Sequence, residues 1–157
     1  MTKTQIQSAM VDLDLRVAEP KWAKSLPDLE AICQQALNAG AAQMTAKGEV
    51  AVLLTNNAEI QVLNRDWRAK DKPTDVLSFP ADPMDEPFLG DIAIAIGVTQ
   101  EDANTRNIGL DQHLSHLLIH GLLHLLGHDH KDDTEAAEME ALEIAALASL
   151  GWPDPYS

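Results

Sequence analysis

Apolar and polar residues alternate strictly over residues 11–17, which is typical of a half-buried strand. A stretch with helical spacing of its apolar residues follows. Pro27 is expected to open this helix and Gly40 to end it, because proline suits the first helical turn and glycine the position after the last. A second strand is predicted to cover Val50, Val52 and Leu54.

The middle of the chain predicts one more helix and two more strands. Asn57 is expected to cap the helix, because an asparagine side chain accepts a hydrogen bond from a backbone N–H of the first turn. The residues expected to face the core are Ile60, Leu63 and Trp67. Strands are predicted over residues 75–79 and 91–96, and the acidic, proline-containing stretch between them predicts a loop.

The chain after Gln100 predicts helices. One runs to Arg106, the next covers residues 111–126 and the last covers residues 134–150. The buried stripe of the last helix is expected to contain Met139, Leu142, Ala146 and Leu150. This order of elements predicts the α+β class, with a mixed four-stranded sheet packed against helices in one domain over residues 1–157.

The composition is typical of a compact intracellular enzyme. The chain has 157 residues, 45% of them hydrophobic, which is enough to bury a core. Cys33 is the only cysteine, so no intramolecular disulfide forms, and its place on an apolar helix face predicts a buried thiol. No charged and apolar leader opens the chain, and no apolar run approaches the roughly 20 residues that cross a bilayer. We therefore expect a cytoplasmic protein with no membrane partner.

All six histidines lie between residues 113 and 130, and three of them form the pattern HxxxHxxGxxH. His120 and His124 are four residues apart on the predicted helix, so their rings project from one face and can bind one ion. Gly127 is expected to end the helix and turn the chain back, which brings His130 to the pair. His128 is the competing third ligand, but the turn at Gly127 favours His130. Three histidines leave one tetrahedral position open, as in catalytic zinc sites.

The residue after the first histidine of this pattern is Gly121. In zinc peptidases of the HExxH type that position is a glutamate, which acts as the general base of peptide hydrolysis. The sequence therefore predicts a zincin-like metal frame that does not hydrolyse peptides by that route.

The charge distribution limits the partners of the protein. A net charge of −14 opposes general nucleic-acid binding, in which phosphate contacts dominate. Four of the eleven basic residues nevertheless lie within eight positions: Arg65, Arg68, Lys70 and Lys72. The C-terminal segment is acidic, with Asp129, Asp132, Asp133, Glu135, Glu138, Glu140 and Glu143. A local basic strip suits transient binding of a single strand. The alternative is a solvated helix end whose cations complement the helix dipole.

Several segments together resemble the YbeY family of bacterial endoribonucleases. They are NRDWRAKDKPTDVLSFP at residues 64–80, GDI at 90–92, HGLLHLLGHDH at 120–130 and GWPDPY at 151–156. The basic strip, the TDVLSF strand and the three-histidine pattern occur here in the order of that family. The resemblance runs from about residue 60 to the C-terminus.

The resemblance implies a site and a role. His120, His124 and His130 are expected to bind one Zn²⁺ per chain, and Arg68 is expected to be the functional arginine of the basic strip. The implied activity is zinc-dependent, single-strand-specific endoribonuclease cleavage in 16S ribosomal RNA 3′-end maturation and ribosome quality control. The implied partners are single-stranded RNA, ribosomal RNA and the small ribosomal subunit. No DNA is expected.

The mechanism stays open in part at this level. Zinc can lower the pKa of a bound water or polarise the phosphate, and Arg68 can clamp the phosphodiester. The attacking group is either that water or the RNA 2′-OH. The general base is hydroxide itself, His116, Asp91 or His128, and Asp129 can orient a ligand histidine. Two other classes share these features: a metallohydrolase of another substrate, and a ribosome-associated binding protein with a structural zinc.

Overall fold

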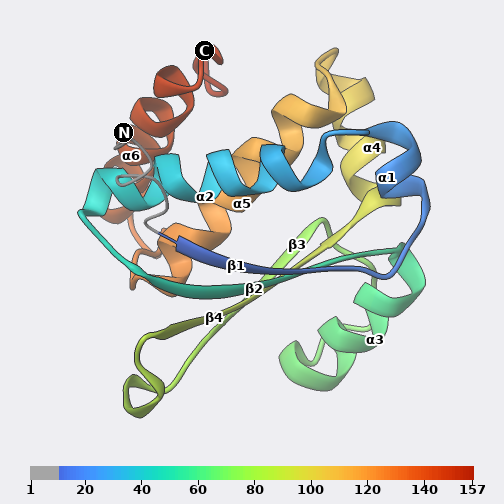
Figure 1. Ribbon diagram of the computed structural model, residues 1–157, viewed down its shortest axis with the longest axis horizontal. Coiled ribbons are helices and arrows are strands. Elements are labelled where there is room, and N and C mark those ends of the chain that lie inside the picture. The colour runs from blue at the N-terminus through green and yellow to red at the C-terminus, as the bar shows by residue number, and fades with distance from the viewer. Residues whose placement is uncertain (1–10) are drawn as a thin grey trace, which may run out of the picture.

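A computed structural model describes residues 11–157 and contains one four-stranded sheet with helices on both faces (Figure 1). The strands lie in the order β1-β2-β4-β3. β1 (Val11–Val17), β2 (Gly48–Thr55) and β4 (Phe88–Ala95) are parallel, and β3 (Val76–Pro80) pairs antiparallel with β4 at one edge. The expected α+β class with a mixed four-stranded sheet is confirmed.

The helices cover the two faces of the sheet unequally. They are α1 (Lys21–Ser25), α2 (Leu29–Met44), α3 (Asn57–Arg68), α4 (Ile96–Arg106), α5 (Leu110–Leu125) and α6 (Asp133–Ser149). The proline-containing connection between β3 and β4 includes a short 3₁₀ turn, η2 (Pro83–Asp85). In Figure 1, α2, α5 and α6 lie on one side of the sheet and α3 lies on the other. Among the described residues, no helix combines the length and the apolar character that crossing a membrane requires.

The main core lies between the sheet and helices α2, α5 and α6. The largest side chains that it buries completely include Leu37, Leu54, Ile92, Leu114, Leu118, Ile119, Leu122 and Met139. Cys33 is fully buried in this core, as expected, and its burial, with the charge of Glu30, raises the pKa of its thiol to about 12. Because α5 contributes so many of these residues, its position relative to the sheet is fixed by the core.

The expectation that Gly40 ends the second helix is wrong. α2 continues to Met44 and ends at Thr45, which takes the left-handed conformation at φ 50°. Gly40 lies inside the helix, where a Cβ would lie 3.2 Å from Leu122 Cδ2 of α5. The glycine therefore allows two buried helices to approach closely and does not terminate one.

The cap of α3 is Asn56 and not the expected Asn57. The Asn56 side chain accepts a hydrogen bond from the Glu59 N–H at 2.9 Å. Asn57 accepts one from the Val98 N–H at 3.0 Å and so stabilises the first turn of α4. That helix begins at Ile96, before the expected start after Gln100.

Trp67 is exposed, contrary to the expectation that it faces the core. Ile60 is fully buried and Leu63 packs against the small core beneath α3, whereas the Trp67 residue is 71% exposed. Helical periodicity placed the three residues on one face correctly. It could not show that an open cleft, which Trp67 lines, lies between the end of α3 and the sheet.

Candidate metal centre

A cleft of about 820 Å³ lies between the C-terminal part of α5 and the edge strand β3. It brings together the expected ligands and the basic strip, because its lining includes Arg68, Lys70, Lys72, His120, His124, His128, Asp129 and His130. Arg65 is not part of this lining and pairs with Asp66 on the surface, 3.2 Å from its Nε atom.

His120 and His124 are arranged to share one cation. Their Nε2 atoms lie 3.1 Å apart. Nδ1 of His120 donates to Oε2 of Glu143 at 2.7 Å, and Nδ1 of His124 donates to the backbone carbonyl of His128 at 2.9 Å. In neutral rings both Nε2 atoms then carry lone pairs that face each other, which is unfavourable unless a cation lies between them. Two nitrogens at about 2.1 Å from a tetrahedral zinc are about 3.4 Å apart, so the pair fits this ion.

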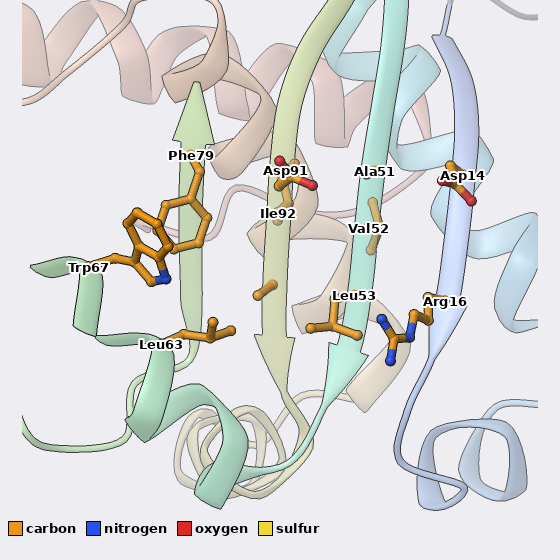
Figure 2. Close-up of a pocket in the computed structure, with 11 residues that line it drawn as sticks. Asp14, Arg16, Ala51, Val52, Leu53, Leu63, Trp67, Phe79, Asp91 and Ile92 are labelled. Carbon is orange, nitrogen blue, oxygen red and sulfur yellow. The ribbon is translucent and has the colours of Figure 1, made fainter. Parts of the chain in front are cut away.

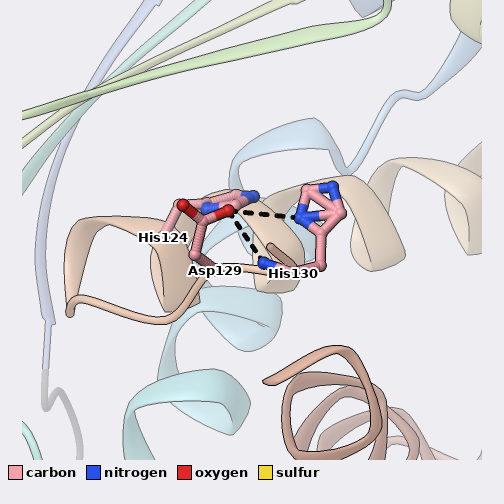
Figure 3. Close-up of side chains that lie close together, drawn as sticks. All are labelled: His124, Asp129 and His130. Atoms are coloured by element: carbon pink, nitrogen blue, oxygen red, sulfur yellow. Dashed lines mark hydrogen bonds and ion pairs between the residues drawn. The ribbon is translucent and has the colours of Figure 1, made fainter. Parts of the chain in front are cut away.

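The turn after α5 brings His130 and Asp129 to this pair. Gly127 has φ +101°, a conformation that suits glycine, and the chain reverses there. The His130 ring centroid lies 5.4 Å from that of His124 and 5.8 Å from that of His120. Figure 3 shows His124, Asp129 and His130 gathered together, with Asp129 joined to His130, and ligand atoms of these three residues lie within 4.8 Å of one another. Asp129 is therefore a further metal-capable group beside the predicted histidines.

His128 is held in a different way from His130. Its Nε2 atom lies 3.3 Å from the sulfur of Met44 on α2, and its backbone carbonyl orients His124. The backbone of His128 thus positions a candidate ligand while its ring contacts another helix. Burial and the neighbouring His120 lower the pKa of His124, which favours the neutral ring that a metal requires.

Glu143 organises the histidines from α6, and the sequence analysis missed it. It belongs to the acidic C-terminal segment, but it is 1% exposed. Its carboxylate accepts hydrogen bonds from His116 Nε2 at 2.6 Å, from His120 Nδ1 at 2.7 Å and from the Tyr156 hydroxyl. A signal was present in the sequence, because Glu143 lies four residues after Met139 within the apolar stripe of the helix.

The Glu143 carboxylate stays ionised despite its burial. Burial opposes ionisation, but the hydrogen bonds from His116, His120 and Tyr156 outweigh it and lower the pKa of Glu143 to about 2. Burial and the same carboxylate raise the pKa of Tyr156. A permanent acceptor on Nδ1 fixes the orientation of the His120 ring and leaves Nε2 free for a ligand role.

Arg68 lies at the rim of the cleft against the edge strand. Its Nη2 donates to the backbone carbonyl of Ser78, and its guanidinium lies over the Phe79 ring at 5.2 Å from the centroid. These contacts use one donor and one face of the planar group, so other N–H donors remain for a phosphate. Lys70 and Lys72 lie along the same cleft and make it locally basic.

Position 121 is closed to a larger side chain. A Cβ on Gly121 would lie 3.0 Å from Ser78 Oγ and 3.2 Å from atoms of Ile92, because this side of α5 packs directly on the sheet. The place that a zinc peptidase gives to its glutamate is therefore part of the helix–sheet contact.

Two of the expected proton acceptors lie outside the cleft. His128 borders it, whereas His116 is buried behind Glu143 and Asp91 belongs to the opposite face of the sheet. Figure 2 looks onto that face, where Asp91 points into a second cleft of about 510 Å³ beside Asp14, Phe79 and Trp67. Burial and the charge of Asp14 raise the pKa of Asp91.

Comparison with known proteins agrees with this fold. A solved structure with the same architecture is the solution structure of TM1509 from Thermotoga maritima, with a TM-score of 0.56, 26% identity and coverage of 88% of this chain and 91% of that one. Two relatives are named endoribonuclease YbeY. The protein from Stutzerimonas stutzeri is 47% identical, over 94% of this chain and 92% of the relative. The protein from Bradyrhizobium diazoefficiens is 46% identical, over 99% of this chain and 91% of the relative.

The family model described as endoribonuclease YbeY matches residues 17–151. The chain belongs to this family.

Proposed function

We propose that the protein is a zinc-dependent endoribonuclease that cleaves single-stranded RNA. The observation that carries the proposal is the convergence of His120 and His124, with Nε2 atoms 3.1 Å apart, in the same cleft as Arg68. Membership of the endoribonuclease YbeY family supports RNA as the substrate class. His120, His124 and His130 hold the metal in this proposal.

The residues of the cleft have different roles in this proposal. Zinc held there supplies Lewis-acid chemistry to the phosphate and to the attacking oxygen. Arg68 binds the scissile phosphodiester through the donors that Ser78 leaves free, and so stabilises the added charge of the transition state. Of the expected proton acceptors, His128 borders the cleft, and Asp129 lies beside the ligand histidines, where it can orient one of them. Glu143 holds His120 in its ligand orientation.

The cellular role proposed is maturation of the 3′ end of 16S ribosomal RNA and ribosome quality control, with the small ribosomal subunit as partner and the cytoplasm as the location. Residues 1–157 act as one catalytic domain. A narrow basic strip on a chain of net charge −14 suits a strand that is bound briefly and released.

In the decisive experiment, metal-loaded protein is incubated separately with a single-stranded RNA, with its matched duplex and with an unstructured peptide. We expect cleavage of the single strand, little cleavage of the duplex and none of the peptide. A chelator should abolish the cleavage and Zn²⁺ should restore it. Peptide cleavage without RNA cleavage would instead assign the cleft to another class of metallohydrolase. A zinc that neither exchanges nor supports cleavage would assign it a structural role.

A further inference from the structure

A second group of metal-capable side chains lies near the N-terminal end of α5. Asp75 immediately precedes β3, Asp102 lies on α4 and His113 lies on α5, and ligand atoms of the three lie within 4.8 Å of one another. His113 precedes His120 by about two helical turns, or roughly 10 Å at 1.5 Å per residue. The group is therefore distinct from the pair of histidines that face each other in the cleft, and Asp75 alone of its members also lines that cleft.

His113 is buried without a hydrogen-bond partner. Its side chain is 3% exposed, and its two ring nitrogens are the only buried side-chain polar atoms of residues 11–157 that lack such a partner. Nε2 lies 3.9 Å from Oδ2 of Asp102, which is too far for a hydrogen bond. A buried imidazole loses its hydration on folding, so an unpaired one is unfavourable unless another group satisfies it.

The two carboxylates near His113 are also uncompensated. Within the described part of the chain, no lysine or arginine nitrogen lies within 4.0 Å of the Asp75 or Asp102 carboxylate. Asp75 accepts from the Val76 N–H with one oxygen, and the Asp102 side chain is 43% exposed, which leaves a path from solvent. Burial and the charge of Arg106 lower the pKa of His113, so its ring is neutral and has a free lone pair.

We propose that Asp75, Asp102 and His113 bind a second divalent cation. Two carboxylates balance its charge and the imidazole supplies a nitrogen ligand, a set that suits Zn²⁺ or Mn²⁺ better than Ca²⁺ or Mg²⁺, which prefer oxygen alone. The ion connects β3 to α4 and α5. Because Asp75 ends the segment that carries Lys70 and Lys72, it also anchors the basic wall of the cleft.

Metal counting tests this proposal. Metal-free protein is titrated with Zn²⁺ by calorimetry, and the bound metal is counted by mass spectrometry after desalting. We expect about two ions per chain in wild type, and about one in Asp102→Asn or in His120→Ala. Glu101→Gln, an exposed neighbour on the same helix, should behave as wild type. Equal metal content in wild type and Asp102→Asn would overturn the proposal.

A stability measurement in the His120→Ala background isolates the second site from the cleft. In this background, Mn²⁺ should raise the Tm of the protein that has His113. Adding His113→Phe should remove this rise, and the Tm measured in chelator should be at least as high as that of the protein with His113. If the Mn²⁺ response survives His113→Phe, the ion binds elsewhere and the proposal is wrong. The cleft lacks a ligand in this background, so such a failure would leave the RNA-cleavage proposal unaffected.

Discussion

The two faces of the sheet carry different chemistry. One face is buried under α2, α5 and α6, and where α5 ends beside β3 the rings of His120 and His124 are each held by a hydrogen-bond partner. The opposite face carries α3 and a small core, and the described residues that line its cleft include Asp14 and Asp91 but no histidine. The comparison indicates that the proposed site depends on a helix fixed by the main core, and we expect changes on the open face to leave that site undisturbed.

Removing a histidine from the cleft tests this comparison most severely. His120→Ala, His124→Ala and His130→Ala should each lose the zinc of the cleft and with it RNA cleavage, because these three ligands hold that ion in our proposal. Metal content and cleavage of a single-stranded RNA measure both effects. His128→Ala is the matched control and should keep most of its zinc, since its ring contacts Met44. Zinc loss in His128→Ala with retention in His130→Ala would reverse the ligand assignment.

Arg68→Ala should separate chemistry from metal binding. Losing one oriented donor to the transition state typically lowers the rate by roughly 10²–10³, while zinc content and Tm should stay close to wild type. Arg68→Lys should recover part of the rate, because lysine keeps the charge but not the planar fork of donors. Single-turnover cleavage assays measure the effect. If the cleavage rate of Arg68→Ala falls by less than about threefold, the change is below the usual range for such a donor, and the arginine has no place in the proposed mechanism.

Glu143→Gln should weaken zinc binding in the cleft and lower the stability of the fold. The amide offers one acceptor oxygen in place of two, so at least one of His116, His120 and Tyr156 loses its partner. We expect zinc affinity to fall about 10–100-fold. The free energy of unfolding should fall by about 1–3 kcal/mol. Competition with a chelator and denaturant unfolding measure these effects, and Glu140→Gln on the exposed side of α6 is the control. Unchanged zinc affinity would show that His120 needs no orientation by Glu143.

The smallest effect is expected on the open face. Asp91→Asn should leave the zinc content unchanged, because the sheet separates Asp91 from the cleft. The rate of RNA cleavage should stay within about threefold of wild type, which is a smaller change than the loss of a catalytic donor usually causes. A loss of cleavage comparable to that of Arg68→Ala would show that the two faces act together. It would also return Asp91 to consideration as the general base.

Local spacing explains which parts of the site could be predicted from the sequence. His120 and His124 lie on one helix, and Gly127 ends it, so short-range rules of helix geometry were sufficient. Glu143 contacts histidines 23 and 27 positions away, through the packing of α6 on α5. No periodicity within one segment specifies such a contact, although a glutamate inside an apolar stripe indicates burial.

The errors in the fold have a similar cause. Gly40 can end a helix or let two helices approach, and only the neighbouring α5 decides between these uses. Trp67 follows the periodicity of α3, but the extent of the sheet beneath that helix is a tertiary property. The strand order also required tertiary pairing, since β4 inserts between β2 and β3. The class of fold was predictable because the alternation of strands and helices is a local pattern.

Tyr156 has a consequence for how the site is made in the cell. Its hydroxyl donates a hydrogen bond to the Glu143 carboxylate, 13 positions earlier in the chain. The same hydroxyl oxygen lies 3.3 Å from Nε2 of His116, 40 positions earlier. Chains leave the ribosome from their N-terminus, so every histidine of the motif emerges before the tyrosine that completes the hydrogen bonds of Glu143. A product of interrupted translation that ends between Glu143 and Tyr156 would carry the full HxxxHxxGxxH pattern with an incompletely paired carboxylate behind it. The hydrogen bonds behind the candidate ligands are thus completed only after the chain has been made through Tyr156.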